Sequence, residues 1–132
     1  MHSPEPSLTD AKYFSLRSFK KNGQPVDTPV WFAAIDSRLI VFTDGTSYKV
    51  KRIRRNPQVQ IAVCDVRGKL LGSWQPAMCR PIETDTAYIA RCYDALNRKY
   101  GLMMRIGTVF ATLAGRVSRR LILELTLDAQ SA

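Results

Sequence analysis

Residues 41–57 read VFTDGTSYKVKRIRRNP, and this stretch decides how the rest of the chain is arranged. It begins as the end of an apolar strand, turns through small and polar residues, and continues as a short helix that must end before Pro57. The first N–H groups of a helix lack partners within the helix, and the helix dipole favours an anion beside them. A turn rich in hydroxyl groups that leads into a basic helix therefore predicts a binding site for a phosphate group.

Helical spacing separates the cations of this stretch into two groups. At about 100° per residue, Val50 and Ile53 share one face, which we expect to be buried against the protein. Lys49 and Arg52 lie beside one another at the edge of that face, whereas Lys51 points to the far side. A ligand held against the body of the protein would contact Lys49 and Arg52 first. The alternative is that the basic residues only form a solvated helix face.

The composition is typical of a globular protein except for its charge. The chain has 132 residues, of which 45% are hydrophobic and 23% charged, and this predicts a single domain over residues 1–132 with flexible tails at 1–6 and 128–132. The formal net charge of +9 indicates an anionic partner. A phosphorylated small molecule, a nucleic acid and an acidic membrane surface all satisfy this charge, and it does not choose among them.

The cysteines and the single histidine limit which kinds of functional site are possible. The cysteines Cys64, Cys79 and Cys92 are widely spaced and odd in number, so we expect free thiols, a reducing compartment and a cytoplasmic protein. The only histidine, His2, lies in the N-terminal tail, which argues against a metal site and against a Ser-His or Cys-His catalytic pair. No apolar run approaches the roughly 18 residues of a membrane-spanning helix, so no transmembrane helix is expected, and we assign no membrane partner.

Alternation of apolar and polar residues predicts six strands, and helical periodicity predicts a long helix near the C-terminal end. The turns Asn22-Gly23 and Asp36-Ser37-Arg38 join the first three strands into an antiparallel meander. Pro76 and Pro81 limit their segment to an edge strand or a bulged strand. The predicted strands are 13–19, 25–35, 39–43, 58–65, 70–82 and 116–127, the helices are 8–11, the basic stretch before Pro57 and 86–100, and residues 102–113 are ambiguous.

Many antiparallel strands with few helices predict a mainly β fold, closed or nearly closed into a small barrel that leaves no exposed edges. Three stretches, in their order and spacing, carry a resemblance to a known family: Thr28-Pro29-Val30-Trp31-Phe32, then Phe42-Thr43 with residues 47–57, then residues 59–63 leading to Arg67-Gly68. Over residues 13–127 the chain resembles the pyridoxamine 5′-phosphate oxidase-like split β-barrel family. Within that family it looks more closely like the branch of flavin- and deazaflavin-dependent oxidoreductases found in actinobacteria.

This resemblance implies an antiparallel split β-barrel of the FMN-binding type, in a homodimer with a cofactor in each of two clefts at the interface. It also implies how the cofactor is held. The cofactor phosphate would bind a strand-end hydroxyl and the basic residues that follow, and its ring would lie against the second strand. The implied contacts are Thr43, Ser47, Lys49 and Arg52 for the phosphate, and the backbone of Pro29, Val30 and Trp31 for the ring.

The basic stretch carries more positive charge than one phosphate needs, and this favours coenzyme F420 over FMN. F420 has a phosphodiester and a polyglutamyl tail that Lys51, Arg54 and Arg55 could attract. The first hypothesis is therefore an F420-dependent oxidoreductase that transfers hydride between reduced deazaflavin and an unsaturated or carbonyl-bearing small molecule. The alternatives are an FMN-binding flavoprotein, a cofactor carrier or sensor of the same fold, and a nucleic-acid-binding barrel. We assign no catalytic side chain, because in hydride transfer the cofactor supplies the reactive atom.

Overall fold

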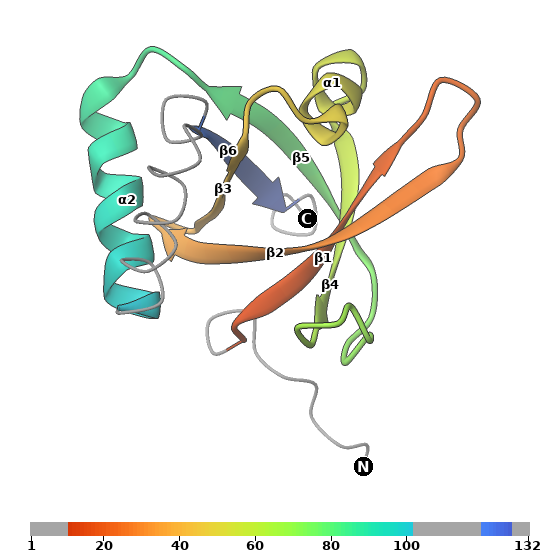
Figure 1. The fold of residues 1–132 in the computed structure, drawn as a ribbon, viewed down its shortest axis with the longest axis horizontal. Helices are drawn as coiled ribbons and strands as arrows, with labels where there is room; N and C mark the ends of the chain where they lie inside the picture. Colours follow the sequence, from red (N-terminus) through yellow and green to blue (C-terminus); the bar gives the residue numbers. More distant parts are fainter. Residues whose placement is uncertain (1–10, 102–119, 128–132) are drawn as a thin grey trace.

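The computed structural model describes residues 11–101 and 120–127 of the chain. Within these residues the fold is mainly β and antiparallel, as the sequence predicts, and two helices lie outside the sheet (Figure 1). The elements in chain order are β1 (Tyr13–Phe19), β2 (Pro25–Ile35), β3 (Arg38–Asp44), α1 (Tyr48–Arg55), β4 (Gln58–Cys64), β5 (Gln75–Ile82), α2 (Thr86–Tyr100) and β6 (Arg120–Leu127).

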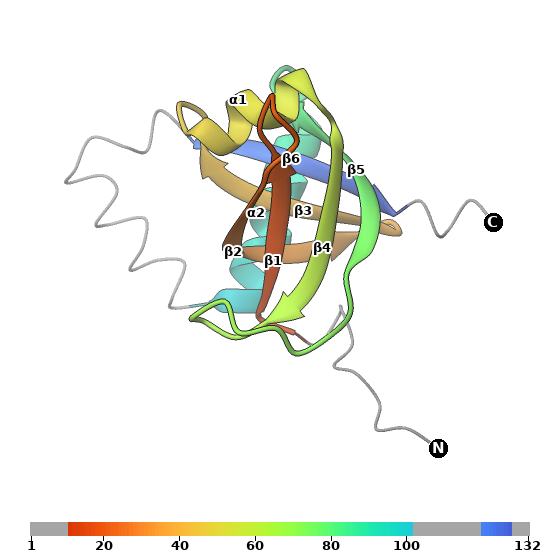
Figure 2. The ribbon, with the colours of Figure 1, turned by 90° about the vertical axis from the view of Figure 1, so that its right-hand side faces the viewer.

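The strands form a closed barrel in the order β1-β2-β3-β6-β5-β4, with β4 returning to pair with β1. The meander of the first three strands is confirmed, and β6 is inserted between β3 and β5. In Figure 2, β1 and β4 lie side by side, α1 crosses one end of the barrel and α2 stands behind it. No helix in the described part of the chain is long and apolar enough to cross a membrane.

The two helices begin and end where the sequence predicts. The Ser47 hydroxyl accepts a hydrogen bond from the Val50 N–H at 3.4 Å and caps the start of α1, which ends at Arg55, two residues before Pro57. Asp85 caps α2 by accepting from the Tyr88 N–H at 3.1 Å, and α2 ends before Gly101, whose φ of 55° suits glycine. The predictions for residues 8–10, 102–113 and 116–119 lie outside the described residues, and Ala11, the last residue of the predicted first helix, is not helical.

The predicted long strand over residues 70–82 is wrong at its start, because β5 begins only at Gln75. The Asp65 carboxylate accepts hydrogen bonds from the N–H groups of Arg67 and Lys69, both at 2.9 Å, and this turn redirects the chain. Only one bridge, between Cys64 and Leu70, pairs the segment that follows with β4. Side-chain hydrogen bonding to the backbone therefore replaces the strand that alternation alone predicted.

The prolines of β5 lie where the strand has one hydrogen-bonded neighbour. Pro76 belongs to the part of β5 that pairs with β4, and Pro81 to the part that pairs with β6, while Ala77 and Met78 pair with both neighbours. The prediction of an edge strand is wrong for β5 as a whole, since it lies between two strands of a closed barrel. Each proline nevertheless avoids the doubly paired centre, where its missing N–H would break a ladder.

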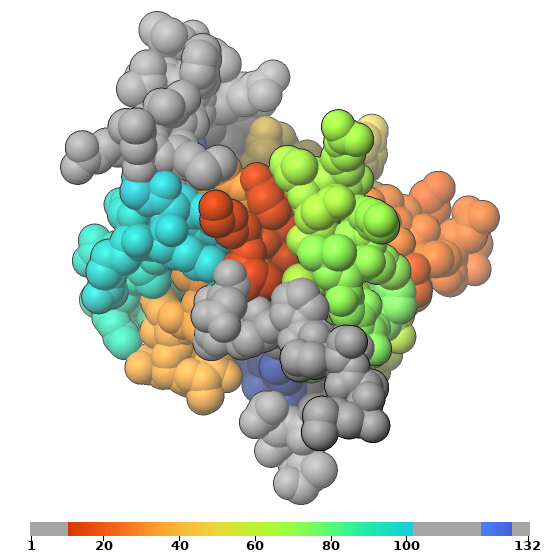
Figure 3. Space-filling view, turned by 90° about the horizontal axis from the view of Figure 1, so that it is seen from below, coloured from red at the N-terminus to blue at the C-terminus, as the bar shows by residue number. Residues whose placement is uncertain are grey.

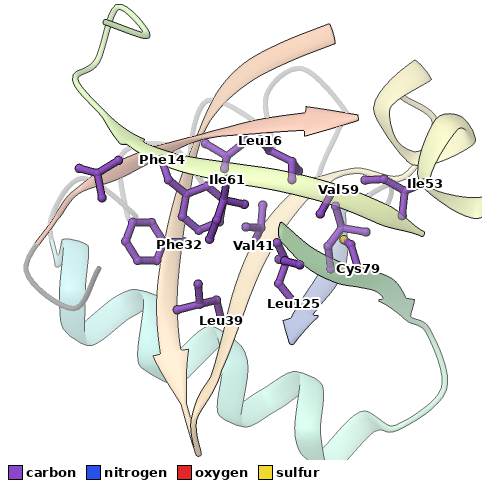
Figure 4. Close-up of a cluster of buried hydrophobic side chains, with 14 of the residues drawn as sticks. Phe14, Leu16, Phe32, Leu39, Val41, Ile53, Val59, Ile61, Cys79 and Leu125 are labelled. Carbon is purple, nitrogen blue, oxygen red and sulfur yellow. The ribbon is translucent and has the colours of Figure 1, made fainter. Parts of the chain in front are cut away.

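The barrel interior holds the larger of two apolar clusters (Figure 4). Phe14 and Phe32 lie in contact with ring centroids 4.5 Å apart, and Ile53 of α1 lies beside Val59 and Cys79 at one end of the barrel. Ile53 is 1% exposed, which confirms the predicted buried face of α1. The helix that carries the basic residues is thus held against the barrel by its own apolar side.

The second apolar cluster lies between α2 and the outer faces of β2, β3, β5 and β6. Its members from α2 include Cys92 and Leu96, which are fully buried.

Next to this cluster Glu124 of β6 is 3% exposed and accepts hydrogen bonds from Arg80 at 2.9 Å and Arg38 at 3.1 Å. Burial raises the pKa of Glu124, but the nearby Tyr88 hydroxyl, the hydrogen bond from Arg80 and the charges of Arg80 and Arg38 outweigh burial, so that its pKa is lowered.

Candidate functional site

A groove runs over the outer faces of the first three strands. Phe14 and Val41 point into the barrel, so the neighbouring residues Tyr13 and Phe42 point outward, and Tyr13 pairs with Trp31 across the β1–β2 ladder. The groove has a volume of about 400 Å³, within the range of small-molecule sites. Its lining residues are Tyr13, Pro29, Val30, Trp31, Phe42, Lys49 and Arg120.

Aromatic rings form one wall of this groove. The Trp31 ring meets the edge of Phe42, with ring centroids 6.0 Å apart and an angle of 62° between the planes. Trp31 also stacks on Tyr100 of α2, with ring centroids 4.6 Å apart and planes 9° from parallel. Trp31 is thus fixed by two aromatic neighbours, and a flat apolar surface suits a planar ring ligand.

Lys49 lines the groove from α1 and reaches the end of β3. Its ammonium group donates a hydrogen bond to the Thr43 hydroxyl at 2.9 Å. Burial is the main cause that lowers the pKa of Lys49, the charge of Arg52 lowers it further, and Asp44 acts in the opposite direction. The folded protein therefore disfavours the positive charge of Lys49, and an anion bound in the groove would stabilise it.

Arg52 and Ser47 have partners of their own. The Arg52 guanidinium donates to the buried Ser18 hydroxyl of β1 at 2.7 Å, so this side chain follows the barrel wall rather than the groove. The Ser47 hydroxyl accepts from the Val50 N–H as the cap of α1. A hydroxyl that accepts a hydrogen bond still has its own proton to donate, so the cap leaves Ser47 able to contact an anion.

The three remaining cations of the basic stretch also contact other groups. Arg54 forms an ion pair with Glu83, and Arg55 donates to the Phe19 carbonyl at 3.1 Å. The Lys51 ammonium lies 5.1 Å from the centroid of the exposed Tyr48 ring. The argument that surplus charge favours F420 is therefore weakened for Arg54 and Arg55, whose positions are explained by contacts within the protein.

Arg120 is a groove residue that the sequence did not predict. It begins β6 directly opposite Asp44 of β3, and its guanidinium lies 5.0 Å from the centroid of the Phe42 ring. The sequence carries no signal for this position, because the pairing of β6 with β3 brings together residues 76 positions apart and depends on barrel closure. Arg120 adds a second cation to the groove, beside Lys49.

Four of the eight predicted cofactor contacts line one groove: Pro29, Val30, Trp31 and Lys49. Thr43 joins them through its hydrogen bond to Lys49. The other three, Ser47, Lys51 and Arg52, belong to α1 or its cap, and they do not line the groove as the structure describes it. Binding of a cofactor by these residues remains a prediction.

The fold and the sequence together define the family. Residues 5–128 match the family model described as pyridoxamine 5′-phosphate oxidase. The chain therefore belongs to the pyridoxamine 5′-phosphate oxidase-like family, as the resemblance of its motifs indicated. A comparison with curated proteins gives no match.

Solved structures of the same fold come from several bacteria. The heme storage protein HutZ of Vibrio cholerae has a TM-score of 0.67 and 16% identity, and the match covers 90% of this chain and 83% of HutZ. An FAD-binding protein of Mesorhizobium loti has a TM-score of 0.61 and 17% identity, with 92% and 82% covered. Protein Rv2991 of Mycobacterium tuberculosis has a TM-score of 0.66 and 18% identity, with 92% and 76% covered. Likeness at these identities establishes the fold alone.

Proposed function

We propose that this protein is an oxidoreductase that binds a phosphate-bearing flavin or deazaflavin cofactor in the groove over β1, β2 and β3. The observation that carries the proposal is the combination of a flat aromatic wall at Trp31 with a half-buried Lys49 whose charge the fold disfavours. A planar ring would contact the wall, and an anionic group would pair with Lys49. The family match and the FAD-binding structural neighbour support this cofactor class.

The residues of the groove fit such a group. Lys49 and the Thr43 hydroxyl would hold the phosphate, since a hydroxyl that accepts from an ammonium group still has a proton to donate to a phosphate oxygen. The backbone of Pro29, Val30 and Trp31 would line the ring. When bound, the cofactor supplies hydride transfer, and the protein supplies binding, orientation and exclusion of water.

The lining of the groove explains why no catalytic side chain is assigned. Among the described residues, those that line it include no carboxylate, histidine or cysteine. A carboxylate, an imidazole and a thiol are therefore not available there as acid, base or nucleophile, and a hydrolase or a histidine-ligated heme has no support from this groove. A reaction whose reactive atom belongs to the cofactor needs none of these side chains.

The finer choice lies between coenzyme F420 and FMN. F420 is supported by the net charge of +9 and by Arg120 and the exposed Lys51, which could attract the carboxylates of its tail. FMN is supported by the contacts that occupy Arg54 and Arg55, because FMN needs only one phosphate site. If the cofactor is F420, we propose that the protein uses reduced F420 to reduce an unsaturated or carbonyl-bearing substrate. If the cofactor is FMN, we propose a flavoprotein or a cofactor carrier.

We also propose a homodimer that covers the groove. The groove lies on the outside of the barrel, next to exposed apolar side chains of the segment between β4 and β5, namely Val66, Leu70 and Leu71. Gly68 places this segment beside the groove, since a Cβ built on it would lie 3.9 Å from the Pro29 side chain. Exposed apolar residues at the rim of a site are typical of a surface that a partner covers.

The decisive experiment is a parallel titration of the purified apoprotein with FMN and with F420, followed by ultraviolet-visible spectra and isothermal titration calorimetry at about 0.1 M and about 1 M salt. Screening shortens from about 10 Å to about 3 Å over this range, so contacts of exposed cations with the F420 tail should weaken steeply. Tighter F420 binding with a steep salt dependence supports the deazaflavin assignment. Tighter FMN binding at both salts supports the flavoprotein, and binding of neither cofactor overturns the proposed function.

A further inference from the structure

The ladder between β1 and β2 ends at a tyrosine hydroxyl. The last pair of that ladder is Tyr13 with Trp31, so the next pair in register would be Lys12 with Phe32. At this point the Tyr100 hydroxyl accepts from the Phe32 N–H at 2.9 Å, and it lies 2.7 Å from the Lys12 carbonyl oxygen and 2.8 Å from that of Phe32. A side chain of α2 thus occupies the place of a direct bond between the strands.

Hydrogen-bond chemistry limits what this hydroxyl can do. A tyrosine O–H has one proton, which it donates to one of the two carbonyl oxygens while its oxygen accepts from the Phe32 N–H. Burial raises the pKa of Tyr100 to about 12, so that the proton is retained at neutral pH. The hydroxyl therefore bridges the two backbones at the point where direct pairing of β1 and β2 has ended.

The bridge lies directly beside the proposed ring-binding wall. The ring of Tyr100 stacks on Trp31, and the bridged residues Lys12 and Phe32 are chain neighbours of the groove residues Tyr13 and Trp31. In the view from below, the start of β1 (red) lies between the end of α2 (cyan) and the segment after β4 (green) (Figure 3). One residue of α2 therefore contacts both strands that form the groove floor and supports its main aromatic ring.

We propose that Tyr100 is the positioning residue of the groove: its hydroxyl holds β1 and β2 apart, and its ring sets the plane of Trp31, so that the groove accepts a planar ring. This inference rests on the proposed cofactor class. It assigns the ring-binding half of the site to Tyr100 and leaves the phosphate-binding half to Lys49 and Thr43.

The test separates the two halves with two probes, riboflavin for the ring and inorganic phosphate for the anion. Tyr100→Phe removes the hydroxyl and retains the stacking ring, while Tyr88→Phe is the matched control. Tyr88 is another tyrosine of α2 that packs in the same apolar cluster, and at 1.5 Å per residue it lies about 18 Å along the helix from Tyr100. We expect Tyr100→Phe to bind riboflavin about tenfold more weakly, on the scale of one or two lost hydrogen bonds, with unchanged affinity for phosphate.

A second variant tests the route through Trp31. Trp31→Leu should weaken riboflavin binding by a similar factor, and adding Tyr100→Phe to it should have little further effect, because the two residues act on the same wall. Amide exchange measured by NMR on the apoprotein gives a readout that needs no cofactor. The Phe32 amide should exchange faster than in the wild type in Tyr100→Phe, and at the wild-type rate in Tyr88→Phe.

The outcomes distinguish failure of this inference from failure of the proposed function. Three results would each overturn the role of Tyr100. They are wild-type riboflavin affinity in Tyr100→Phe, an equal loss of affinity in Tyr88→Phe, and an unchanged exchange rate of the Phe32 amide in Tyr100→Phe. If the wild-type protein binds neither riboflavin, FMN nor F420, the proposed function fails, and the ring-binding role of Tyr100 fails with it. In that case faster exchange of the Phe32 amide would support only the structural bridge between the strands.

Discussion

Replacing Lys49 by methionine should change cofactor affinity and protein stability in different directions. The ammonium group of Lys49 is half-buried against Thr43, and burial together with the charge of Arg52 lowers its pKa. The folded apoprotein therefore holds a charge in an unfavourable place. A bound phosphate would supply the opposite charge that the apoprotein lacks in the groove.

The magnitude follows from these contacts. Methionine is similar in length to lysine and carries no charge, so Lys49→Met removes the cost of burying an ammonium group, and the melting temperature of the apoprotein should not fall. The same substitution removes a charge-assisted hydrogen bond to phosphate, worth about 1.5–3 kcal/mol. The Kd for FMN should therefore rise about tenfold to a hundredfold.

Differential scanning calorimetry of the apoprotein and calorimetric titration with FMN measure the two effects on the same preparation. Lys21→Met is the matched control, because it makes the same chemical change at an exposed position between β1 and β2, and it should alter neither value. A misfolded variant would lose stability and affinity together, so the opposite pattern identifies a binding role. Wild-type FMN affinity in Lys49→Met would refute the phosphate site, and a clear fall in melting temperature would refute the electrostatic argument.

Three further predictions concern acid stability, the second cation and the assembly. Because the pKa of Glu124 is lowered in the folded state, its carboxylate stabilises the fold above the ordinary glutamate pKa of 4.5 and loses this effect as pH falls through the lowered value. The difference in unfolding free energy between wild type and Glu124→Gln, measured by urea titration, should thus be constant near pH 7 and shrink below about pH 4.5; a difference that does not change with pH would contradict this. Arg120→Met should weaken FMN binding by roughly tenfold and Arg120→Lys by less. If titration shows that both variants bind FMN as tightly as the wild type, Arg120 does not contribute to the site. Light scattering at micromolar concentration should give the mass of a dimer, and a monomer would argue against the covered groove.

Local sequence signals predicted those parts of the structure that depend on neighbouring residues. Pro57 marked the end of α1, and helical periodicity placed α2 at its observed bounds, because each signal acts within a few positions of the chain. Alternation likewise placed β1 and β2 at their observed bounds. The same local reasoning located Lys49 at the edge of α1, facing the groove.

What the sequence did not predict depends on contacts that closure of the barrel creates. The partner of Arg54 is Glu83, beyond two further strands, so the two residues cannot be matched by spacing. Arg120 reaches the groove only because β6 pairs with β3, and the role of Tyr100 depends on where the end of α2 meets β1. A helix-terminal tyrosine without this context is most simply a packing residue, and that is how the sequence alone would treat Tyr100.

The position of β6 between β3 and β5 has a consequence for biosynthesis. β6 is the last of the described strands to be translated, and it completes both flanking ladders at once. Until residues 120–127 emerge from the ribosome, the nascent chain presents two unpaired strand edges, with Leu123 and Leu125 missing from the interior. Productive folding must therefore wait until β6 has been synthesised, and a product truncated before Arg120 should aggregate rather than fold. In a proteolysis assay on nascent chains, β3 and β5 should become protected from cleavage only after β6 has emerged from the ribosome.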